Sequence, residues 1–398
     1  MYYERALTIT IKEASETFPA VLITGPRQVG KTTILEKCRE QNRTFVSLDN
    51  PKFCRLAKED PDLFFQTFHP PILIDEVQYA PELFLYIKMI SDRERKNGLF
   101  WMTGSQQFHL MKNVTESLAG RVAIFNLQGL SQSEKLQLKS EVFSVENRTQ
   151  TQKTLDSTQI YEMIIKGSFP FLFAQKRVNL ETFYSSYLQS YLERDVRDLI
   201  SVSNLQDFLR FMEVTAARTG QLLNYSDIAK DTGIGLNTAK SWLSILEASG
   251  IIYFLRPYFN NLTSRAIKTP KMYYLDTGLC CHISGWNSAE ALEKSAMSGA
   301  LLETYAISEI IKSFWHNGQR APMFFYRDKE QKEVDLIIEK NGVLNPIEIK
   351  KTASPTERDI KNFSVLERFN LGKGAILCLS KDKVPLNRDV DIIPICSI

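Results

Sequence analysis

Eight consecutive residues near the N-terminus, Gly25 to Thr32, have the types and spacing of a loop that binds phosphate. They fit the pattern GxxxxGK[ST] and lie between a short apolar stretch and a segment with helical periodicity. In such a loop, backbone N–H groups attract phosphate oxygens, the lysine reaches the β- and γ-phosphates, and the final hydroxyl is a ligand of Mg²⁺. The pattern therefore predicts a site for ATP and Mg²⁺. The residues expected to contact the nucleotide are Gly25, Pro26, Arg27, Gln28, Val29, Gly30, Lys31, Thr32, Thr33 and, later in the chain, Ser105.

A later apolar stretch ends in two adjacent acids, Asp75 and Glu76. Asp75 is expected to hold a magnesium-bound water, and Glu76 is expected to orient and polarise the water that attacks the γ-phosphate. These roles would make a nucleotide-binding protein a hydrolase. The same two-acid ending is common where a strand passes into a loop, so the assignment depends on its distance from Lys31, which leaves room for one further strand–helix unit.

Polar side chains also follow the next apolar stretch, at residues 103–106, where a sensor of hydrolysis would lie beside the γ-phosphate. A helix is expected over residues 106–118, and Arg121 follows it. Two roles are open for this arginine. It reaches the phosphate site of a neighbouring subunit and stabilises transition-state charge, or it caps the carbonyl groups at the end of that helix.

A second cluster of charged residues, near the C-terminus, has the chemistry of phosphodiester hydrolysis. Residues 333–338 and 346–350 are expected to form a hairpin, and the period of two in a strand puts Glu348 and Lys350 on one face. Asp335 can join them from the other strand. The carboxylates would bind Mg²⁺ or Mn²⁺, and the lysine would stabilise charge on the attacking water or in the transition state. Because Glu-x-Lys also occurs on ordinary solvated strands, a purely structural role stays open.

The elements that position these residues are visible in the apolar pattern. In the first third of the chain, short apolar runs alternate with helix-length segments, which is typical of βα units around a buried parallel sheet. Such a sheet presents its ligand site at the carboxyl ends of its strands, where the loop and the two acids follow. The runs are residues 20–24, 45–48, 71–75, 99–103 and 122–127.

Residues 223–285 predict a winged-helix-like module, because two helical segments precede two apolar strands at 251–255 and 272–275. The second helix is expected to turn Leu236, Ala239, Leu243 and Leu246 inward. The side chains that could meet DNA are Asn237, Thr238, Lys240 and Ser241 on its outer face and Arg256, Arg265, Lys268 and Lys271 in the wing. Contact with DNA and a structural or protein-docking role both stay open, since a fold does not fix a function.

The 398 residues are enough for several domains, and we expect an α/β multidomain chain. The expected divisions are a parallel-sheet ATPase domain over 1–134, a helical lid or linker over 135–222, the winged-helix-like module over 223–285 and an α/β C-terminal domain over 286–398.

The composition excludes several classes of protein. A net charge of +3 excludes a chain-wide basic field for nucleic acid or membrane, and 43% apolar with 24% charged residues excludes collagen-like and disordered chains. Six cysteines without a CxxC pair and four scattered histidines give no zinc-ligand spacing and indicate a reducing compartment. Since neither a signal peptide nor an apolar run of spanning length is present, we expect a cytoplasmic protein without membrane contact.

Together the motifs resemble the prokaryotic AAA-superfamily ATPases that carry a C-terminal domain of unknown function with a restriction-endonuclease-like fold. The resemblance extends over nearly the whole chain. It implies that Asp335, Glu348 and Lys350 match the D…ExK centre of nucleases with that fold, with Glu303 as an additional acid and metal ligand. A ring of several copies is implied by this resemblance alone. The stretches that carry it are residues 25–32, 48–51, 74–78, 103–105, 117–121, 191–196, 271–278, 333–335 and 347–350.

Two functions from different classes follow. The first is Mg²⁺-dependent ATP hydrolysis coupled to a DNA-associated, nuclease-like C-terminal domain. The second is a nucleotide-dependent switch that binds a protein partner, with a nuclease-like fold that is catalytically silent. A DNA-bound regulator is a third reading. Metal-dependent cleavage of DNA separates the first two.

Overall fold

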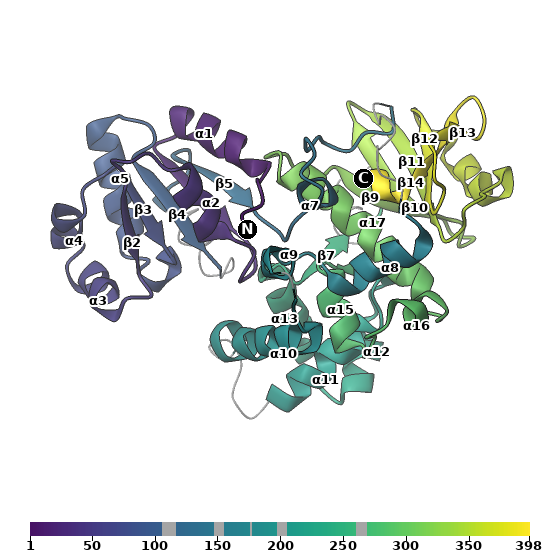
Figure 1. Ribbon diagram of the computed structural model, residues 1–398, viewed down its shortest axis with the longest axis horizontal. Coiled ribbons are helices and arrows are strands. Elements are labelled where there is room, and N and C mark those ends of the chain that lie inside the picture. The colour runs from purple at the N-terminus through teal and green to yellow at the C-terminus, as the bar shows by residue number, and fades with distance from the viewer. Residues whose placement is uncertain (106–116, 147–154, 176, 197–204, 260–268) are drawn as a thin grey trace.

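The computed structural model describes residues 1–105, 117–146, 155–175, 177–196, 205–259 and 269–398 (Figure 1). The N-terminal part folds around a five-stranded sheet in which all strands are parallel, in the order β2-β3-β4-β1-β5. The strands β1, β3 and β4 are buried along their whole length, because helices cover both faces. The predicted buried parallel sheet is confirmed. Its strands are β1 (Ala20–Thr24), β2 (Thr44–Ser47), β3 (Ile72–Asp75), β4 (Phe100–Gly104) and β5 (Val122–Asn126).

Alternate residues of each strand pack against different helices. Val21 of β1 lies in the apolar cluster of α1 and α2, whereas Leu22 lies in that of α3, α4 and α5. Asn50 and Asp60 begin α3 and α4, since each side chain accepts a backbone N–H bond and proline follows in the first turn. The helices are α1 (Leu7–Thr17), α2 (Lys31–Cys38), α3 (Pro51–Glu59), α4 (Pro61–Thr67), the 3₁₀ turn η1 (Val77–Tyr79) and α5 (Leu83–Glu94).

The middle of the chain is mainly helical and contains an antiparallel sheet in the order β6-β8-β7. Helix α13 buries three of its four predicted inward residues, but Leu236 is exposed and that prediction is wrong. Leu236 is the first residue of the helix, at the edge of the packed face, and Trp242 is buried instead. The elements are α7 (Gln132–Lys135), α8 (Ser157–Lys166), α9 (Pro170–Ala174), α10 (Leu180–Tyr191), the π-helical turn η2 (Leu192–Val196), α11 (Leu205–Ala216), β6 (Gln221–Leu222), α12 (Tyr225–Thr232), α13 (Leu236–Ala248), β7 (Ile252–Leu255), β8 (Lys271–Tyr274), α15 (Thr277–Ile283) and α16 (Ala289–Glu293).

The C-terminal part folds around a six-stranded mixed sheet in the order β13-β14-β12-β11-β10-β9. The expected hairpin is present, because β10 and β11 pair antiparallel with Lys340 opposite Val343. The pairing of β10 with β9 shifts register between Val334 and Ile337. The elements are α17 (Ser298–Trp315), β9 (Met323–Arg327), β10 (Glu333–Lys340), β11 (Val343–Lys350), η4 (Glu357–Leu366), β12 (Gly374–Cys378), β13 (Val384–Pro385), β14 (Val390–Pro394) and η5 (Ile395–Ser397).

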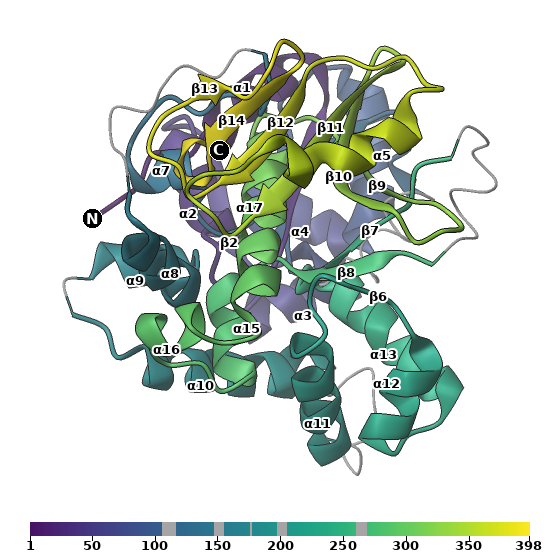
Figure 2. The same ribbon diagram turned by 90° about the vertical axis from the view of Figure 1, so that its right-hand side faces the viewer.

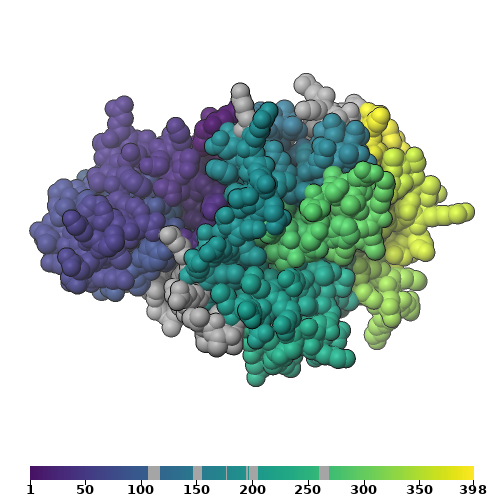
Figure 3. Space-filling view, turned by 60° about the horizontal axis from the view of Figure 1, so that its bottom comes forward, coloured from purple at the N-terminus to yellow at the C-terminus, as the bar shows by residue number. Residues whose placement is uncertain are grey.

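Helix α17 lies between the N-terminal sheet and the C-terminal sheet (Figures 1 and 2). Its buried residues follow one another with few interruptions from Leu301 to Phe314, as expected for a helix with neighbours on all sides. One apolar cluster joins α1 and α2 with the middle helices, α17 and the C-terminal sheet. Figure 3 shows the middle of the chain, in teal and green, between the N-terminal and C-terminal parts. Among the described residues no helix is long and apolar enough to cross a membrane, and the six cysteines are unpaired.

Candidate functional site

The predicted phosphate-binding loop connects β1 to α2, and its path depends on two glycines. Gly25 has φ of +143°, and a Cβ there would collide with the carbonyl oxygen of Leu127. Gly30 has φ of +93° and begins α2. Gln28 also adopts a left-handed conformation, with φ of 61°, which is uncommon for a side chain of this kind. The backbone thus makes a tight turn directly before a helix N-terminus, the arrangement that binds phosphate.

Lys31 and Thr32, the last two residues of the loop, point to different partners. Lys31 is buried, and its Nζ donates to the carbonyl oxygens of Gly25 at 3.0 Å and of Pro26 at 2.7 Å. The Thr32 hydroxyl donates to Asp75 Oδ1 at 2.6 Å. The loop and the acid, which are far apart in the sequence, are therefore in direct contact.

Asp75 is surrounded by hydroxyl groups from neighbouring strand ends. Thr103 Oγ1 donates to Oδ1 at 2.6 Å, and Ser47 Oγ donates to Oδ2 at 3.3 Å. Because β2, β3 and β4 are adjacent and parallel, their carboxyl ends meet at one edge of the sheet. Carboxylate and hydroxyl oxygens are the ligands that Mg²⁺ takes in proteins, so this donor set fits that ion.

Glu76 follows Asp75 in a left-handed conformation, with φ of 54°. Its N–H donates to Thr103 Oγ1 at 3.0 Å, and its carboxylate accepts from Ser105 Oγ at 3.2 Å and from Gln78 Nε2 at 2.5 Å. A non-glycine residue in this conformation has a backbone cost, and such residues concentrate at functional sites. The side chains around it hold the carboxylate in one orientation.

The structure brings together most of the predicted nucleotide-site residues, with two qualifications. The side chain of Thr33 is exposed on α2. The side chain of Pro26 is buried against the middle of the chain, where a Cβ atom added to Gly250 would lie 3.1 Å from the proline ring. Thr103 belongs to the polar stretch predicted at residues 103–106, and its hydroxyl does lie at this site. No role is predicted for Ser47 or Gln78, although a hydroxyl or amide residue beside each predicted strand end is a usable signal.

Arg121 contacts its own domain. Its guanidinium forms two hydrogen bonds with the carboxylate of Asp92 on α5, at 2.6 and 3.1 Å, and a third with the carbonyl oxygen of Ala119 at 3.2 Å. The bond to Ala119 is the kind expected of an arginine that caps the carbonyl groups at a helix end. Most of the helix expected over 106–118 lies outside the described residues, and the role across a subunit boundary stays a prediction.

The C-terminal acids also come together. Lys350 Nζ lies 2.5 Å from Glu348 Oε2 and 3.5 Å from Asp335 Oδ2, and the N–H of Ile349 donates to Asp335 Oδ2 at 2.9 Å. Asp335 lies where β10 shifts register against β9, and a bulge of this kind re-aims a side chain. Glu303 on α17 accepts a bond of 2.6 Å from the hydroxyl of Tyr273.

A buried lysine from the middle of the chain enters this cluster. Lys271 on β8 lies 3.0 Å from Glu303 Oε1 and 2.6 Å from Glu333 Oε1. The expectation that Lys271 contacts DNA is therefore wrong, because its ammonium group is turned inward toward acids. Of the other predicted contacts, Arg265 and Lys268 lie outside the described residues. Asn237, Lys240 and Ser241 are exposed and Thr238 is half-buried on α13.

The charges of this cluster shift one another's protonation. Burial alone would lower the pKa of Lys271, but the neighbouring carboxylates outweigh it and raise that pKa above its ordinary value. Burial, followed by the charge of Asp335, raises the pKa of Glu348 to about 9. Burial opposes ionisation of Asp335 as well, yet Lys350 and Lys271 hold its pKa below the ordinary value. Within the described ranges, no three His, Cys, Asp or Glu residues are grouped to hold a metal ion.

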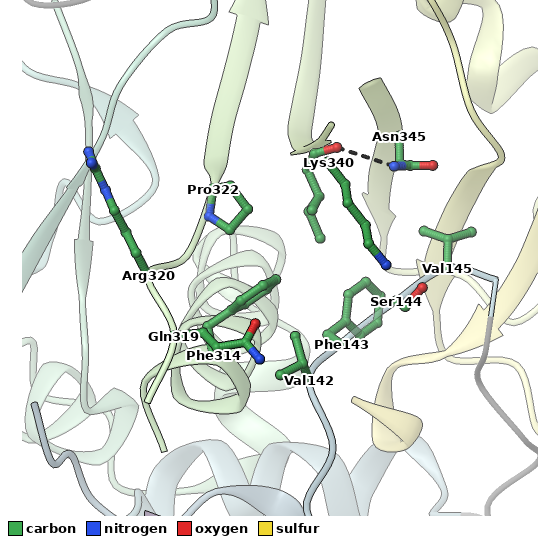
Figure 4. Close-up of a pocket in the computed structure, with 11 residues that line it drawn as sticks. Val142, Phe143, Ser144, Val145, Phe314, Gln319, Arg320, Pro322, Lys340 and Asn345 are labelled. Carbon is green, nitrogen blue, oxygen red and sulfur yellow. Dashed lines mark hydrogen bonds between the residues drawn. The ribbon is translucent and has the colours of Figure 1, made fainter. Parts of the chain in front are cut away.

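A pocket of about 440 Å³ lies apart from both clusters, between residues 142–145, the C-terminal end of α17 and the β10–β11 hairpin (Figure 4). Lys340 points toward Ser144, and Asn345 donates to the carbonyl oxygen of Ile338 at 3.3 Å. The residues that line it in the described part of the chain include none of the predicted site residues.

Residues 17–136 match the family model described as an AAA domain. This part of the chain is similar to AAA domains and is called the AAA-type domain below. This AAA-type domain includes the whole parallel sheet, the phosphate-binding loop and the two acids that follow β3. Residues 157–290 and 298–398 match models described as domains of unknown function, DUF8612 and DUF4143.

Two curated relatives match the AAA-type domain and the rest of the chain together. They are uncharacterized proteins from Mycobacterium tuberculosis and Mycobacterium bovis, each 28% identical over 388 residues, which is 96% of this chain and 82% of the relative.

Solved structures show weaker similarity. A Walker-type ATPase from Pyrococcus abyssi is 16% identical, with a TM-score of 0.40 over 70% of this chain and 94% of that one. The RuvB Holliday junction branch migration motor of Thermotoga maritima is 16% identical, with a TM-score of 0.29 over 62% of this chain and 86% of that one. Since both TM-scores are below 0.5, the assignment of the AAA-type domain depends on the family model and the site geometry.

Proposed function

We propose that the protein binds ATP with Mg²⁺ at residues 25–32 and hydrolyses it. The observation that carries the proposal is the hydrogen bond of 2.6 Å between the Thr32 hydroxyl and Asp75, which joins the loop to the acid at one edge of the sheet. Hydrolysis needs a phosphate cradle, ligands for the ion and a carboxylate for the water, and all three meet there.

Each side chain has a distinct role in this proposal. Thr32 and Asp75 would hold Mg²⁺, which when bound neutralises charge on the phosphate oxygens. Lys31 would exchange the carbonyl oxygens it now contacts for β- and γ-phosphate oxygens. Glu76 would orient the attacking water and accept its proton, and Ser105, which donates to that carboxylate, would link its position to the γ-phosphate.

Equilibrium binding of ATP and steady-state release of phosphate test the proposal with Lys31→Ala. We expect loss of ATP binding and of hydrolysis, because Lys31 is the only lysine in the loop and its ammonium group would bind the phosphates. Lys37→Ala, an exposed lysine on the same helix, is the matched control and should leave both unchanged. A Lys31→Ala protein that turned over ATP at the parental rate would refute the proposal.

We further infer that the AAA-type domain acts as a nucleotide-dependent switch and that the C-terminal domain is a nuclease-like fold without cleavage activity. The helix that carries Glu303, the hairpin with Asp335 and the adjacent parallel strand β12 support the restriction-endonuclease-like arrangement. Lys271 favours the silent form, because its ammonium group lies 3.0 Å from Glu303, one of the acids that would hold a metal ion. Because this ammonium group already neutralises part of the carboxylate charge, the acids do not need a bound metal ion for that purpose.

The competing function is ATP hydrolysis coupled to DNA cleavage through the winged-helix-like module. The arrangement of α12, α13, β7 and β8 supports such a module, but the burial of Lys271 removes one of its basic residues. Incubation with plasmid DNA and Mn²⁺ separates the two, with Asp335→Ala as the control. We expect equal, background nicking by both proteins. Nicking by the parent that Asp335→Ala abolishes would establish the nuclease instead.

A further inference from the structure

Arg5, which precedes α1, is buried and bonded to the phosphate-binding loop. Its Nη1 donates to the carbonyl oxygen of Val29 at 2.8 Å, and its Nη2 donates to that of Gln128 at 2.7 Å. Its Nε lies 3.1 Å from Glu134 Oε1. One guanidinium therefore joins the loop, the segment that follows β5 and helix α7, and its planar fork suits three partners in fixed directions.

The bond to Val29 acts on the part of the loop that faces phosphate. In a trans peptide the C=O of one residue and the N–H of the next point in opposite directions. When Arg5 holds the carbonyl of Val29, it therefore fixes the plane of this peptide and keeps the N–H of Gly30 turned away from the guanidinium. Gly30 is a position where the glycine conformation, with φ of +93°, leaves the peptide free to rotate. The guanidinium removes that freedom.

The partner of Arg5 is itself bound to the C-terminal part of the chain. Glu134 Oε2 lies 3.2 Å from Nδ1 of His316, directly after α17, and His316 Nε2 accepts the N–H of Gln128 at 3.2 Å. Because Nε2 accepts, a neutral ring carries its proton on Nδ1, the nitrogen that lies 3.2 Å from Glu134. Gln128 is thus held at its carbonyl by Arg5 and at its N–H by His316.

The same segment contacts α17 a second time. Glu309 accepts the N–H of Gln132 at 2.6 Å, and its carboxylate lies 3.0 Å from Lys312 and 3.5 Å from Lys135. All of these side chains are buried. Buried charged groups keep their geometry because leaving one unpaired is costly. A shift of α17 would therefore move residues 128–135, and with them the partners of Arg5.

We propose that Arg5 is a positioning residue that holds the loop in its phosphate-binding form, and that Glu134 and His316 make this hold depend on the docking of α17. The inference rests on the proposed binding of ATP at residues 25–32. It assigns the coupling between the AAA-type domain and the C-terminal domain to a defined set of buried contacts. Nucleotide binding and α17 docking then favour each other, since such coupling is reciprocal.

The test compares two buried arginines of the same domain. Arg5→Lys keeps the charge but has one nitrogen, so it cannot hold Val29, Gln128 and Glu134 together. Arg43→Lys is the matched control, because Arg43 donates to the carbonyl oxygen of Gly98 at 2.9 Å and lies over Trp101, away from the loop. We expect Arg5→Lys to raise the Kd for ATP about tenfold, the loss of one charged hydrogen bond, with kcat at saturation changed far less. If Arg5→Lys does not fold, Glu134→Gln takes its place.

The dependence on α17 is tested with His316→Gln, because the ring of His316 contacts Gln128 and Glu134, which lie outside the loop. It should raise the Kd for ATP by a smaller factor. His282→Gln, whose ring on α15 lies 3.4 Å from Glu181 on α10, should not change the Kd. An ATP affinity of Arg5→Lys equal to that of Arg43→Lys would overturn the positioning role. An unchanged affinity in His316→Gln would overturn the coupling. A parent protein that binds no ATP would instead contradict the proposed function itself.

Discussion

The two acidic clusters of this protein each place aspartate and glutamate on or beside the strands of a sheet, but different groups face them. Asp75 in the AAA-type domain receives hydrogen bonds from the hydroxyls of Thr32 and Thr103. Asp335 in the C-terminal domain lies beside ammonium groups, of which Lys350 is 3.5 Å away. Neutral donors orient a carboxylate and leave its charge for a cation, whereas ammonium groups neutralise it. Partners contributed by other elements therefore decide what an acidic motif can bind.

The largest expected effect concerns the first cluster. Glu76→Gln keeps the shape of the side chain and removes the proton acceptor, so we expect kcat for ATP to fall by about 10²–10⁴-fold with nearly unchanged nucleotide affinity. Phosphate release and equilibrium binding measure the two quantities. Glu82→Gln, an exposed acid of the same domain, is the control. Parental turnover in Glu76→Gln would mean that its carboxylate serves only to bind Ser105 and Gln78.

The second effect concerns the C-terminal cluster. Lys271→Met leaves the largely buried Glu303 without its ammonium partner and Glu333 with Arg327 alone, and we expect the free energy of unfolding to fall by about 3 kcal/mol. Mn²⁺ should then raise the melting temperature of this variant and not that of the parent. The exposed Lys240→Met is the control for loss of a lysine from the same region. Equal stabilisation of parent and variant by Mn²⁺ would show that Lys271 does not take the place of a metal ion.

The third effect concerns the contacts that join the two regions. Burial lowers the pKa of His316, with Glu134 opposing and Arg5 and Lys312 adding to the shift. In the unfolded chain this ring gains a proton near pH 6.5, while the folded chain does not, so stability is full above that pH and lost as the pH falls. Urea unfolding of the parent should therefore lose up to about 2 kcal/mol between pH 7 and 5. His316→Asn should lose less, and an identical slope would contradict the assignment.

The smallest effect concerns Arg121. Since its guanidinium is bound to Asp92 and to the carbonyl of Ala119, we expect Arg121→Ala to change ATP turnover by less than about twofold. Arg93→Ala is the control for loss of an exposed arginine. Mixing Arg121→Ala with Lys31→Ala protein tests the alternative: turnover that recovers in the mixture would assign Arg121 to a neighbour's phosphate site and make this effect one of the largest.

The parallel sheet and the phosphate-binding loop could be predicted because their signals are local. Buried strands such as Ala20–Thr24 are continuous apolar runs, and the loop has fixed spacing from Gly25 to Thr32. The hairpin around Lys340 and Val343 was predictable for the same reason. In each case the residues that define the feature are close together in the chain.

The partners that decide the chemistry could not be predicted, because they come from distant elements. In the sequence, Lys271 looks like a basic residue of the wing. Only the packing of β8 against α17 turns its side chain toward Glu303. Arg5 lies before the first helix with no motif around it, yet it bonds to Val29 and Glu134. The hydrophobic periodicity of helices and strands says nothing about charged residues such as these, so their contacts depend on the tertiary fold.

The apolar cluster that extends from α1 through α17 to the C-terminal sheet crosses each of the predicted domain divisions. Leu7 and Ile11 of α1 and Leu301 and Ile310 of α17 belong to the same cluster. A truncated chain that ended before α17 would leave part of that surface in contact with water. Chemical denaturation of the intact chain should accordingly show one transition rather than a stepwise loss of separate modules.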